Sequence, residues 1–482
     1  MRQALHIFYK DLRQLRYDVI VTLVLTATFA WYVGRRTPLL GFQTDRLNLV
    51  ANLLGLLLPF AWGYLVARAI YGEPLPGDRQ FWVTRPYRCK SLMGAKVLFI
   101  GAFVVLPLLL SDCVILALQG FHPSAYLAGL AWHPLVFSVA FLLPVAALAC
   151  ITESIVQIVL AVLALIAMVA VLSLVGIPGS PLWFGSLEWV RSSLEFLVLL
   201  TGALAIMILQ YRSRRTGLSR ILAGATLVVA MIAVRFLPWT VAFALQSRVI
   251  KSRVDTSSIS VQFQPGGRPP AVAPQVADKG VRVSLPIGFS GVPLGMVAAA
   301  DGMSGELVLP DGKLSKPLHM GGSEKDKPWY TMSVDRSLYE RVKNTPLRVH
   351  VIVLLTLYGN LHTERMPLEG NSHHVPGIGV CATEPLEVQK VTLVGCLVPF
   401  RMPGRIIGQF DNGVPVEGFE MWGGNSLSPY PADFGISPMD LPRWQLPNQA
   451  GSTAIVFTIM QPLAHVRREL DIPNVQLAEF AN

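Results

Sequence analysis

Two ionisable residues interrupt otherwise apolar stretches of this sequence, and they are the first candidates for chemistry. Asp112 lies in an apolar run near residues 97–119, and Arg235 lies in another near residues 221–245. An ionised group is costly in apolar surroundings, so such residues are usually retained for function. Two readings stay open: the two residues pair with each other, or both lie near an interface with water, where the aspartate is hydrated and the arginine extends its head group.

Sequence motifs of common enzymes are absent from the chain. It contains no H-E-x-x-H, no G-x-S-x-G and no G-x-x-x-x-G-K-[ST], so the zinc-protease, nucleophile-elbow and phosphate-loop signatures are all missing. His373 and His374 are adjacent, which in a strand would send them to opposite faces, and His362 with Glu364 has no identifiable third ligand. We therefore expect no catalytic residues, no metal site and no cofactor in this chain.

The elements that carry these residues are predicted by composition. The 482 residues are 52% hydrophobic and 15% charged, with a mean hydropathy of +0.49, whereas soluble domains are about 25% charged. A helix needs about 20 apolar residues to cross a bilayer. Seven candidate runs lie near residues 18–34, 48–70, 97–119, 135–152, 155–176, 194–211 and 221–245. Only Thr152, Glu153 and Ser154 separate the fourth run from the fifth, which predicts a helical hairpin rather than one overlong helix.

Lysine and arginine are distributed unevenly between the loops. The N-terminal segment and the loops after the second and sixth runs hold most of them: Arg2, Lys10, Arg13, Arg16, Arg79, Arg85, Arg88, Lys90, Lys96, Arg212, Arg214, Arg215 and Arg220. The other side has few, with the Arg35–Arg36 pair as the main exception. The positive-inside rule then predicts a cytoplasmic N-terminus in a bacterial-type cytoplasmic membrane, with everything from residue 248 outside after seven crossings. This bias explains much of the net charge of +10, so we expect no nucleic-acid partner.

The first 17 residues have the pattern of an amphipathic helix. Apolar and basic positions alternate at helical spacing, the apolar ones being Leu5, Phe8, Leu12 and Leu15 and the basic ones Lys10, Arg13 and Arg16. Such a helix lies flat in the headgroup layer. The alternative is a solvated start of the first crossing. Both readings keep the segment on the cytoplasmic side.

A basic and aromatic loop follows the second run. Phe81 and Trp82 suit an interface, Pro86 disfavours helix at Arg85, and Arg85 and Arg88 can meet phosphates or an acidic partner. These residue types alone allow two readings: the loop is a docking surface, or its basic side chains only extend toward the membrane surface.

The string FWVTRPYRCKSLMGAK at residues 81–96 resembles the first cytoplasmic loop of ABC-2 type permeases, the membrane subunits of one class of ATP-binding-cassette transporters. The segment HIFYKDLRQLRYD at residues 6–18 is similar to their opening connecting helix, so the resemblance covers about the first 245 residues. It implies that Phe81, Trp82, Arg85, Pro86 and Arg88 dock a separate ATPase subunit that holds ATP and magnesium. It also implies a second permease copy, or a related permease, beside this chain.

This chain departs from that family pattern in one respect. Such permeases commonly have six crossings with both ends inside, whereas this sequence predicts a seventh crossing and an outer domain. The expected organisation is a cytoplasmic helix at 1–17, a transmembrane domain at 18–247 and an extracytoplasmic domain at 248–482.

The C-terminal half is predicted to be a mostly β, sandwich-like domain. Alternating apolar residues through Val281–Leu285 and Val349–Leu357 indicate strands, and we expect further strands near 259–264, 306–309, 329–334, 387–395 and 453–459. Ser337 and Glu340 have capping-box spacing for a short helix at 337–343. Residues 264–275 read as an extended linker or an edge loop.

Cys381 and Cys396 are the two cysteines of this half, whereas Cys89, Cys113 and Cys150 belong to the apolar half. An oxidising compartment would allow the two to form a disulfide, which closes a loop of about 15 residues and contributes roughly 3 kcal/mol. Two free thiols are the alternative.

Two classes of function follow from the sequence. The first is a permease subunit of an ABC transporter, in which the outer domain gates, binds cargo or recruits a periplasmic partner. The second is a membrane-anchored module that binds or senses an extracytoplasmic ligand without transport. The cytoplasmic loops are too short to contain an effector domain, which counts against the second unless another subunit supplies one.

Overall fold

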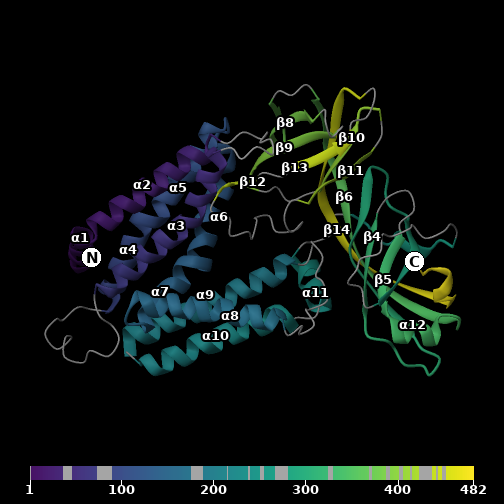
Figure 1. Ribbon diagram of the computed structural model, residues 1–482, viewed down its shortest axis with the longest axis horizontal. Helices are drawn as coiled ribbons and strands as arrows, with labels where there is room; N and C mark the ends of the chain where they lie inside the picture. The colour runs from purple at the N-terminus through teal and green to yellow at the C-terminus, as the bar shows by residue number, and fades with distance from the viewer. Residues whose placement is uncertain are drawn as a thin grey trace.

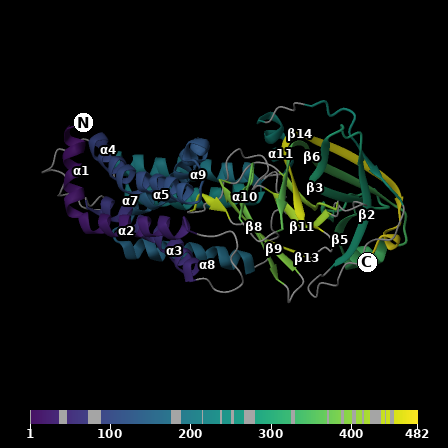
Figure 2. The same cartoon turned by 90° about the horizontal axis from the view of Figure 1, so that it is seen from above.

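Figure 1 shows a helical N-terminal half beside a β-rich C-terminal half. The structure is a computed structural model that describes residues 2–35, 46–72, 89–174, 188–213, 215–236, 239–249, 254–265, 280–323, 329–368, 372–386, 391–400, 405–412, 415–422, 437–440, 443–447 and 452–481. The amphipathic helix at the N-terminus lies at one end of the helical half, and the β-rich half lies toward the other end in both ribbon views (Figures 1 and 2).

The helical half contains the following elements: α1 (Arg2–Gln14), α2 (Arg16–Val33), α3 (Arg46–Tyr71), α4 (Cys89–Ile100), η1 (Gly101–Val105), α5 (Leu106–Leu118), η2 (Pro123–Tyr126), α6 (Leu127–Phe137), η3 (Ser138–Leu142), α7 (Leu143–Ile151), α8 (Ile155–Leu174), α9 (Glu188–Ser213), α10 (Thr216–Phe236) and α11 (Trp239–Val249). In the described part of the chain, five helical stretches are long and apolar enough to cross a membrane: Arg16–Val33, Leu49–Tyr71, Lys90–Leu118, Pro123–Ile151 and Ser193–Ser213. A helical membrane part followed by a β-rich part is thus present, as the sequence predicts.

The fifth and seventh expected crossings correspond to α8 and to α10 with α11. Within the described side chains, α8 and α10 contain the shorter apolar stretches Ile155–Met168 and Thr216–Met231. The expected run at 221–245 spans α10 and α11, and residues 237 and 238 between these two helices lie outside the described part. The break expected between the fourth and fifth runs is present, since α7 ends at Ile151 and α8 begins at Ile155.

Prolines shape two of the long helices. Pro107 and Pro144 each stand near the start of an α-helical segment that directly follows a π-helical turn, η1 or η3. Proline has no N–H group and its ring clashes with the carbonyl one turn earlier. A wider turn before each proline therefore keeps the helix continuous.

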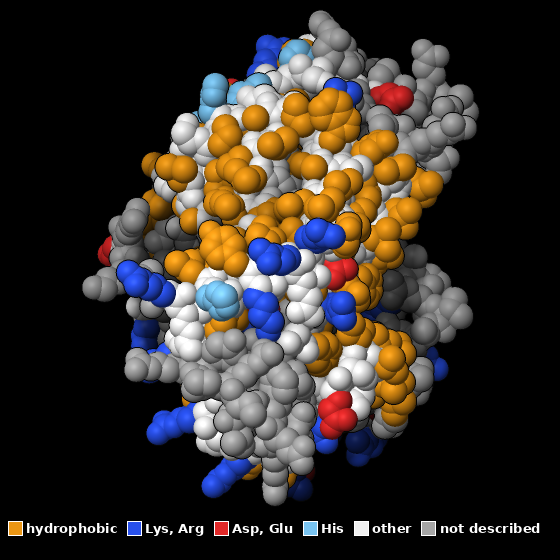
Figure 3. Space-filling model, turned by 90° about the vertical axis from the view of Figure 1, so that its left-hand side faces the viewer, with side chains coloured by type: hydrophobic (Ala, Val, Ile, Leu, Met, Phe, Trp, Pro, Cys, Tyr) orange, Lys and Arg blue, Asp and Glu red, His pale blue; other side chains and the backbone are white. Residues whose placement is uncertain are grey.

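The bundle has an apolar interior and an apolar exterior. Trp62, Leu58 and Leu65 are fully buried, and the Trp62 ring meets Phe137 edge-on at 5.1 Å between centroids. Large apolar side chains such as Phe60 remain exposed, at 68% in that case. Apolar residues dominate the upper part of the end-on view, and Lys and Arg gather in a band below them (Figure 3). Exposed apolar surface of this kind fits a helix bundle in contact with acyl chains.

The β-rich half contains β1 (Ser260–Phe263), β2 (Gly280–Ser290), β3 (Met296–Val308), β4 (Leu318–Ser323), β5 (Trp329–Asp335), α12 (Arg336–Val342), β6 (Leu347–Pro367), β7 (His373–Val375), β8 (Gly379–Leu386), β9 (Val391–Pro399), β10 (Arg405–Phe410), β11 (Pro415–Trp422), β12 (Met439–Asp440), β13 (Arg443–Pro447) and β14 (Ala454–Val475). One sheet has the order β1-β2-β5-β4-β3-β6-β14-β10-β11. The second has the order β12-β9-β8-β7, and β13 pairs with β9. The described neighbours pair antiparallel.

Two cores lie along the long strands β6 and β14. In the first, apolar residues from β1 to β6, α12 and β14 form one cluster, and β1 approaches β14, so this end of the large sheet is rolled. In the second, residues of β8 and β9 meet residues of β10 and β14, so this end is a packing of two sheets. The sandwich expected from sequence describes only the second core.

Most of the expected strands coincide with strands of the structure. The segment 306–309 is the end of the longer strand β3, and the strand expected at 387–395 corresponds to β9, with 387–390 outside the described residues. Most of the linker at 264–275 also lies outside them. The helix expected at 337–343 is α12, but Asp335 caps it, not Ser337 as predicted, because the Asp335 side chain accepts hydrogen bonds from the Ser337 and Leu338 amides.

Candidate functional site

Helix α1 is fixed to the bundle by a buried ion pair. The Lys96 ammonium of α4 donates to Asp11 Oδ2 at 2.7 Å, and the two side chains are only 4% and 2% exposed. Next to this pair, Phe8 stacks on Phe103 at 5.8 Å and meets Phe99 edge-on at 6.2 Å between centroids. These contacts set the rotation of α1 about its own axis.

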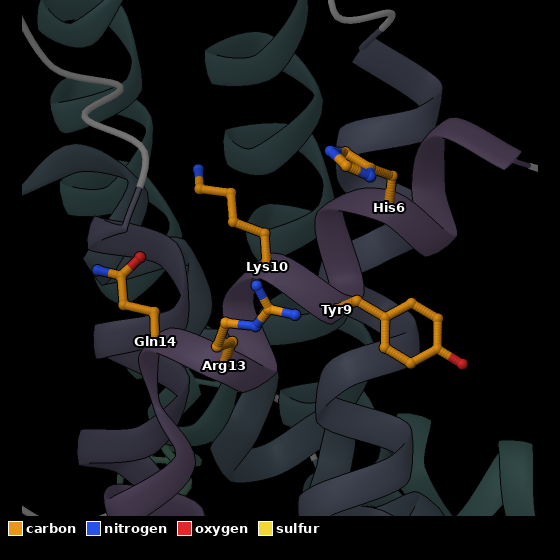
Figure 4. Close-up of a pocket in the computed structure, with 5 residues that line it drawn as sticks. All are labelled: His6, Tyr9, Lys10, Arg13 and Gln14. Atoms are coloured by element: carbon orange, nitrogen blue, oxygen red, sulfur yellow. The ribbon is translucent and has the colours of Figure 1, made fainter.

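The opposite side of α1 is polar and lines a cavity of about 480 Å³. Its lining residues are His6, Tyr9, Lys10, Arg13 and Gln14, and Figure 4 shows their side chains projecting from the helix away from its packed side. Lysine and arginine side chains beside amide, imidazole and phenol groups can bind phosphate or carboxylate oxygens. This face of α1 is therefore suited to an anionic surface or an acidic partner.

The packed face of α1 differs from the sequence prediction. It is centred on Ile7 and Asp11, both buried, whereas Leu5 is 43% exposed. Phe8 and Leu12 pack at the edge of the core, and Leu15 is buried beyond the end of α1. The sequence pattern misses this orientation because it places Lys96 among the charges of a cytoplasmic loop and gives no sign that Asp11 is its partner.

The predicted docking loop lies outside the described residues, and this holds for all five of its named members: Phe81, Trp82, Arg85, Pro86 and Arg88. The helix that follows them, α4, is the one that holds α1.

Asp112, the intramembrane candidate, is fully buried on α5. His133 Nδ1 of α6 lies 2.7 Å from Asp112 Oδ2, and the His133 side chain is 10% exposed. The reading of Asp112 as hydrated is therefore wrong. Its described partner is His133; the backbone of Arg235 lies in α10, and its side chain is outside the described part.

The β-rich half contacts the helical half directly above this pair. Phe400, just beyond β9, lies 6.4 Å from the His133 ring and 6.3 Å from the Tyr126 ring between centroids. A Cβ atom at Gly129 would come within 2.6 Å of the Phe400 ring, so glycine is needed for this approach. Val380 and Met439 complete an apolar cluster with Leu116, Phe121 and Leu130.

A second contact joins α11 to the long strands. His465 Nδ1 of β14 lies 2.7 Å from Thr356 Oγ1 of β6 and 3.4 Å from Gln246 Nε2 of α11. Burial lowers the pKa of His465 to about 4, so this imidazole is neutral at physiological pH.

Cys381 and Cys396 form a disulfide between β8 and β9, where they are directly opposite each other in the register. Both are fully buried in the second core. Among the described residues there is no group of three metal-ligating side chains.

Comparison with protein-family models, with curated proteins and with solved structures finds no match for this chain.

Proposed function

We propose that this chain is the permease subunit of an ABC-2 type transporter, which moves or extrudes a substrate with ATP hydrolysed by a separate subunit. The observation that carries the proposal is the fixed orientation of α1, which presents His6, Lys10 and Arg13 to the cavity while Asp11 and Lys96 hold the opposite side to the bundle. An amphipathic helix held in this way can form one wall of a cytoplasmic docking surface.

The arrangement of the two halves supports this topology. The α1 end and the β-rich half lie at opposite ends of the helices (Figures 1 and 2). In the proposal the α1 end is cytoplasmic, the chain crosses a bacterial-type inner membrane seven times, and the β-rich part at 248–482 is periplasmic. The disulfide of this part fits an oxidising compartment.

The proposal assigns partners to both ends. An ABC ATPase, with its ATP and magnesium, docks at the loop that contains Phe81, Trp82 and Arg85. A second permease copy or a related permease completes the translocation path, and the outer part gates it, binds cargo or recruits a periplasmic protein. This chain then carries out no hydrolysis itself.

Affinity purification of the full chain from its native membrane tests the proposal. Wild type should co-purify with a P-loop ATPase, and replacing Phe81, Trp82 and Arg85 with alanine should abolish that association without changing membrane insertion. The matched control replaces Leu294 and Lys313, which are 103% and 80% exposed on the β-rich half, and should keep the association.

The contrary results are equally clear. An ATPase that stays bound to the triple variant would refute the docking surface. If no ATPase is found even after crosslinking in intact membranes, the chain is instead a membrane-anchored module that senses a ligand through its outer part.

A further inference from the structure

Asp112 is a fully buried carboxyl group of the helical half that has an unsatisfied oxygen among the described residues. The carboxylate is 0% exposed, and its single described hydrogen bond joins Oδ2 to His133. Asp112 Oδ1 and the neighbouring Ser111 Oγ have no hydrogen-bond partner among the described residues. A structural ion pair would be expected to satisfy both oxygens, since a half-satisfied buried network is costly.

The charge of the pair depends on a single proton. With a neutral imidazole that donates from Nδ1, the pair carries one negative charge, and with one further proton it is neutral. His133 is the only titratable group that the described chain brings into hydrogen-bond contact with Asp112. Other titratable groups of the described surroundings are Cys113 on α5, Tyr126 on η2 and His374 on β7, which faces Phe121.

Among the described ion pairs, none brings a lysine or arginine side chain to Asp112. Helix α2 packs along α5, and β8 and β12 contribute the apolar side chains of Val380 and Met439. A net charge in apolar surroundings is unfavourable, and uptake of one proton removes it.

Access to the pair runs past the β-rich half. Of the two side chains only His133 has any exposure, and its ring lies beside Phe400. The Phe400 backbone is held in turn, because its amide donates to the Pro438 carbonyl at 2.8 Å. Phe400 also has a φ of +38°, which is unusual for a residue with a side chain.

We propose that Asp112 and His133 form a proton-binding site at the end of the bundle that faces the β-rich half, with Phe400 as its cover. A proton enters from the aqueous phase on that side and forms a new N–H or O–H bond within the pair, whose charge changes from minus one to zero. Release of the same proton requires Phe400 to move away. The ligand is therefore H⁺, and its exchange is coupled to docking of the β-rich half on α6.

Infrared difference spectroscopy of the full chain in lipid nanodiscs, between about pH 8 and about pH 5, tests this site. Wild type should show a pH-dependent carboxyl or imidazole band that exchanges slowly in D₂O. Asp112→Asn should abolish that band, and His133→Gln should move its midpoint. Glu153→Gln, which removes an exposed carboxylate at the α7–α8 turn, should leave the band unchanged.

A second variant keeps both titrating residues and so remains informative if Asp112→Asn fails to fold. Phe400→Ala should accelerate deuterium exchange of the band by about tenfold or more, because local opening then exposes the pair. Phe289→Ala, which removes a half-buried aromatic ring of β2, should not. Identical spectra for wild type and Asp112→Asn would overturn the proton site, and an unchanged exchange rate in Phe400→Ala would overturn its cover. Neither readout involves an ATPase, so the outcome is separate from that of the transporter proposal.

Discussion

Replacing Asp11 with leucine should release α1 from the bundle, because the Lys96 ammonium would stay buried without a counter-charge. The two groups are 2.7 Å apart and 2–4% exposed, so neither can reach water without movement of the helix. Removing one partner of a buried pair typically costs about 3–5 kcal/mol. At about 1.4 kcal/mol for each factor of ten, α1 should detach between about a hundredfold and a few thousandfold more often.

Hydrogen–deuterium exchange of the α1 amides measures this detachment directly, without assuming reversible unfolding of the whole membrane protein. Lys96→Met should raise exchange as strongly as Asp11→Leu, because it strands the carboxylate instead. The double variant should regain most of the lost protection, since two apolar side chains can replace a buried ion pair at little cost. Arg13→Gln, on the exposed side of the same helix, is the matched control and should exchange like wild type.

Two results would refute this reasoning. Unchanged α1 exchange in Asp11→Leu would mean that the ion pair does not hold the helix. A double variant as unprotected as either single variant would mean that the contact depends on the shape of these side chains and not on their charges.

Two further predictions concern the β-rich half. Replacing Cys381 and Cys396 with alanine should lower its stability to denaturant by about 3 kcal/mol, because the disulfide closes a separation of 15 residues; reductant should reproduce the loss in wild type and have no effect on the variant. The pKa of His465 is about 4 in the folded chain against about 6.5 in the unfolded chain, so the unfolded chain takes up the proton first as the pH falls. Stability should then decrease by about 3 kcal/mol between about pH 6.5 and about pH 4. In His465→Gln, thermal melts should no longer show this loss of stability between about pH 6.5 and about pH 4. A variant whose stability depends on pH as steeply as that of wild type would contradict the burial of this imidazole.

The sequence predicts those features that depend on local periodicity. Three such features have a counterpart in the structure: the apolar runs, the turn at Thr152–Ser154 and the alternation in Val349–Leu357. Each can be recognised from neighbouring residues of one segment, without knowledge of what packs against it. Composition likewise separates the helical half from the β-rich half, because a bundle with an apolar exterior needs far more apolar residues than a sheet with one solvated face.

Local periodicity does not indicate which side chains of different helices or strands contact one another. His133 is 21 positions from Asp112 on the next helix, and nothing local indicates that the two helices bring them together. The sequence places Lys96 among the loop charges, because a lysine near the end of an apolar run usually faces water. Only the packing of α1 on α4 reveals Asp11 as its partner. At α12 both Asp335 and Ser337 suit a cap, and the backbone geometry selects Asp335.

The pairing of β6 with β14 also dictates the order in which the β-rich half can assemble. The two strands run side by side from Leu347 with Val475 to Pro367 with Ala454, so their partners are roughly a hundred residues apart along the chain. Closing a loop of that length is slow compared with making a hairpin. Until the segment 454–475 has left the ribosome, β6 and β10 lack their shared neighbour, and each presents an open strand edge. Open strand edges can pair with other chains, so the arrival of this last long strand closes one edge of each of its two neighbours against such pairing.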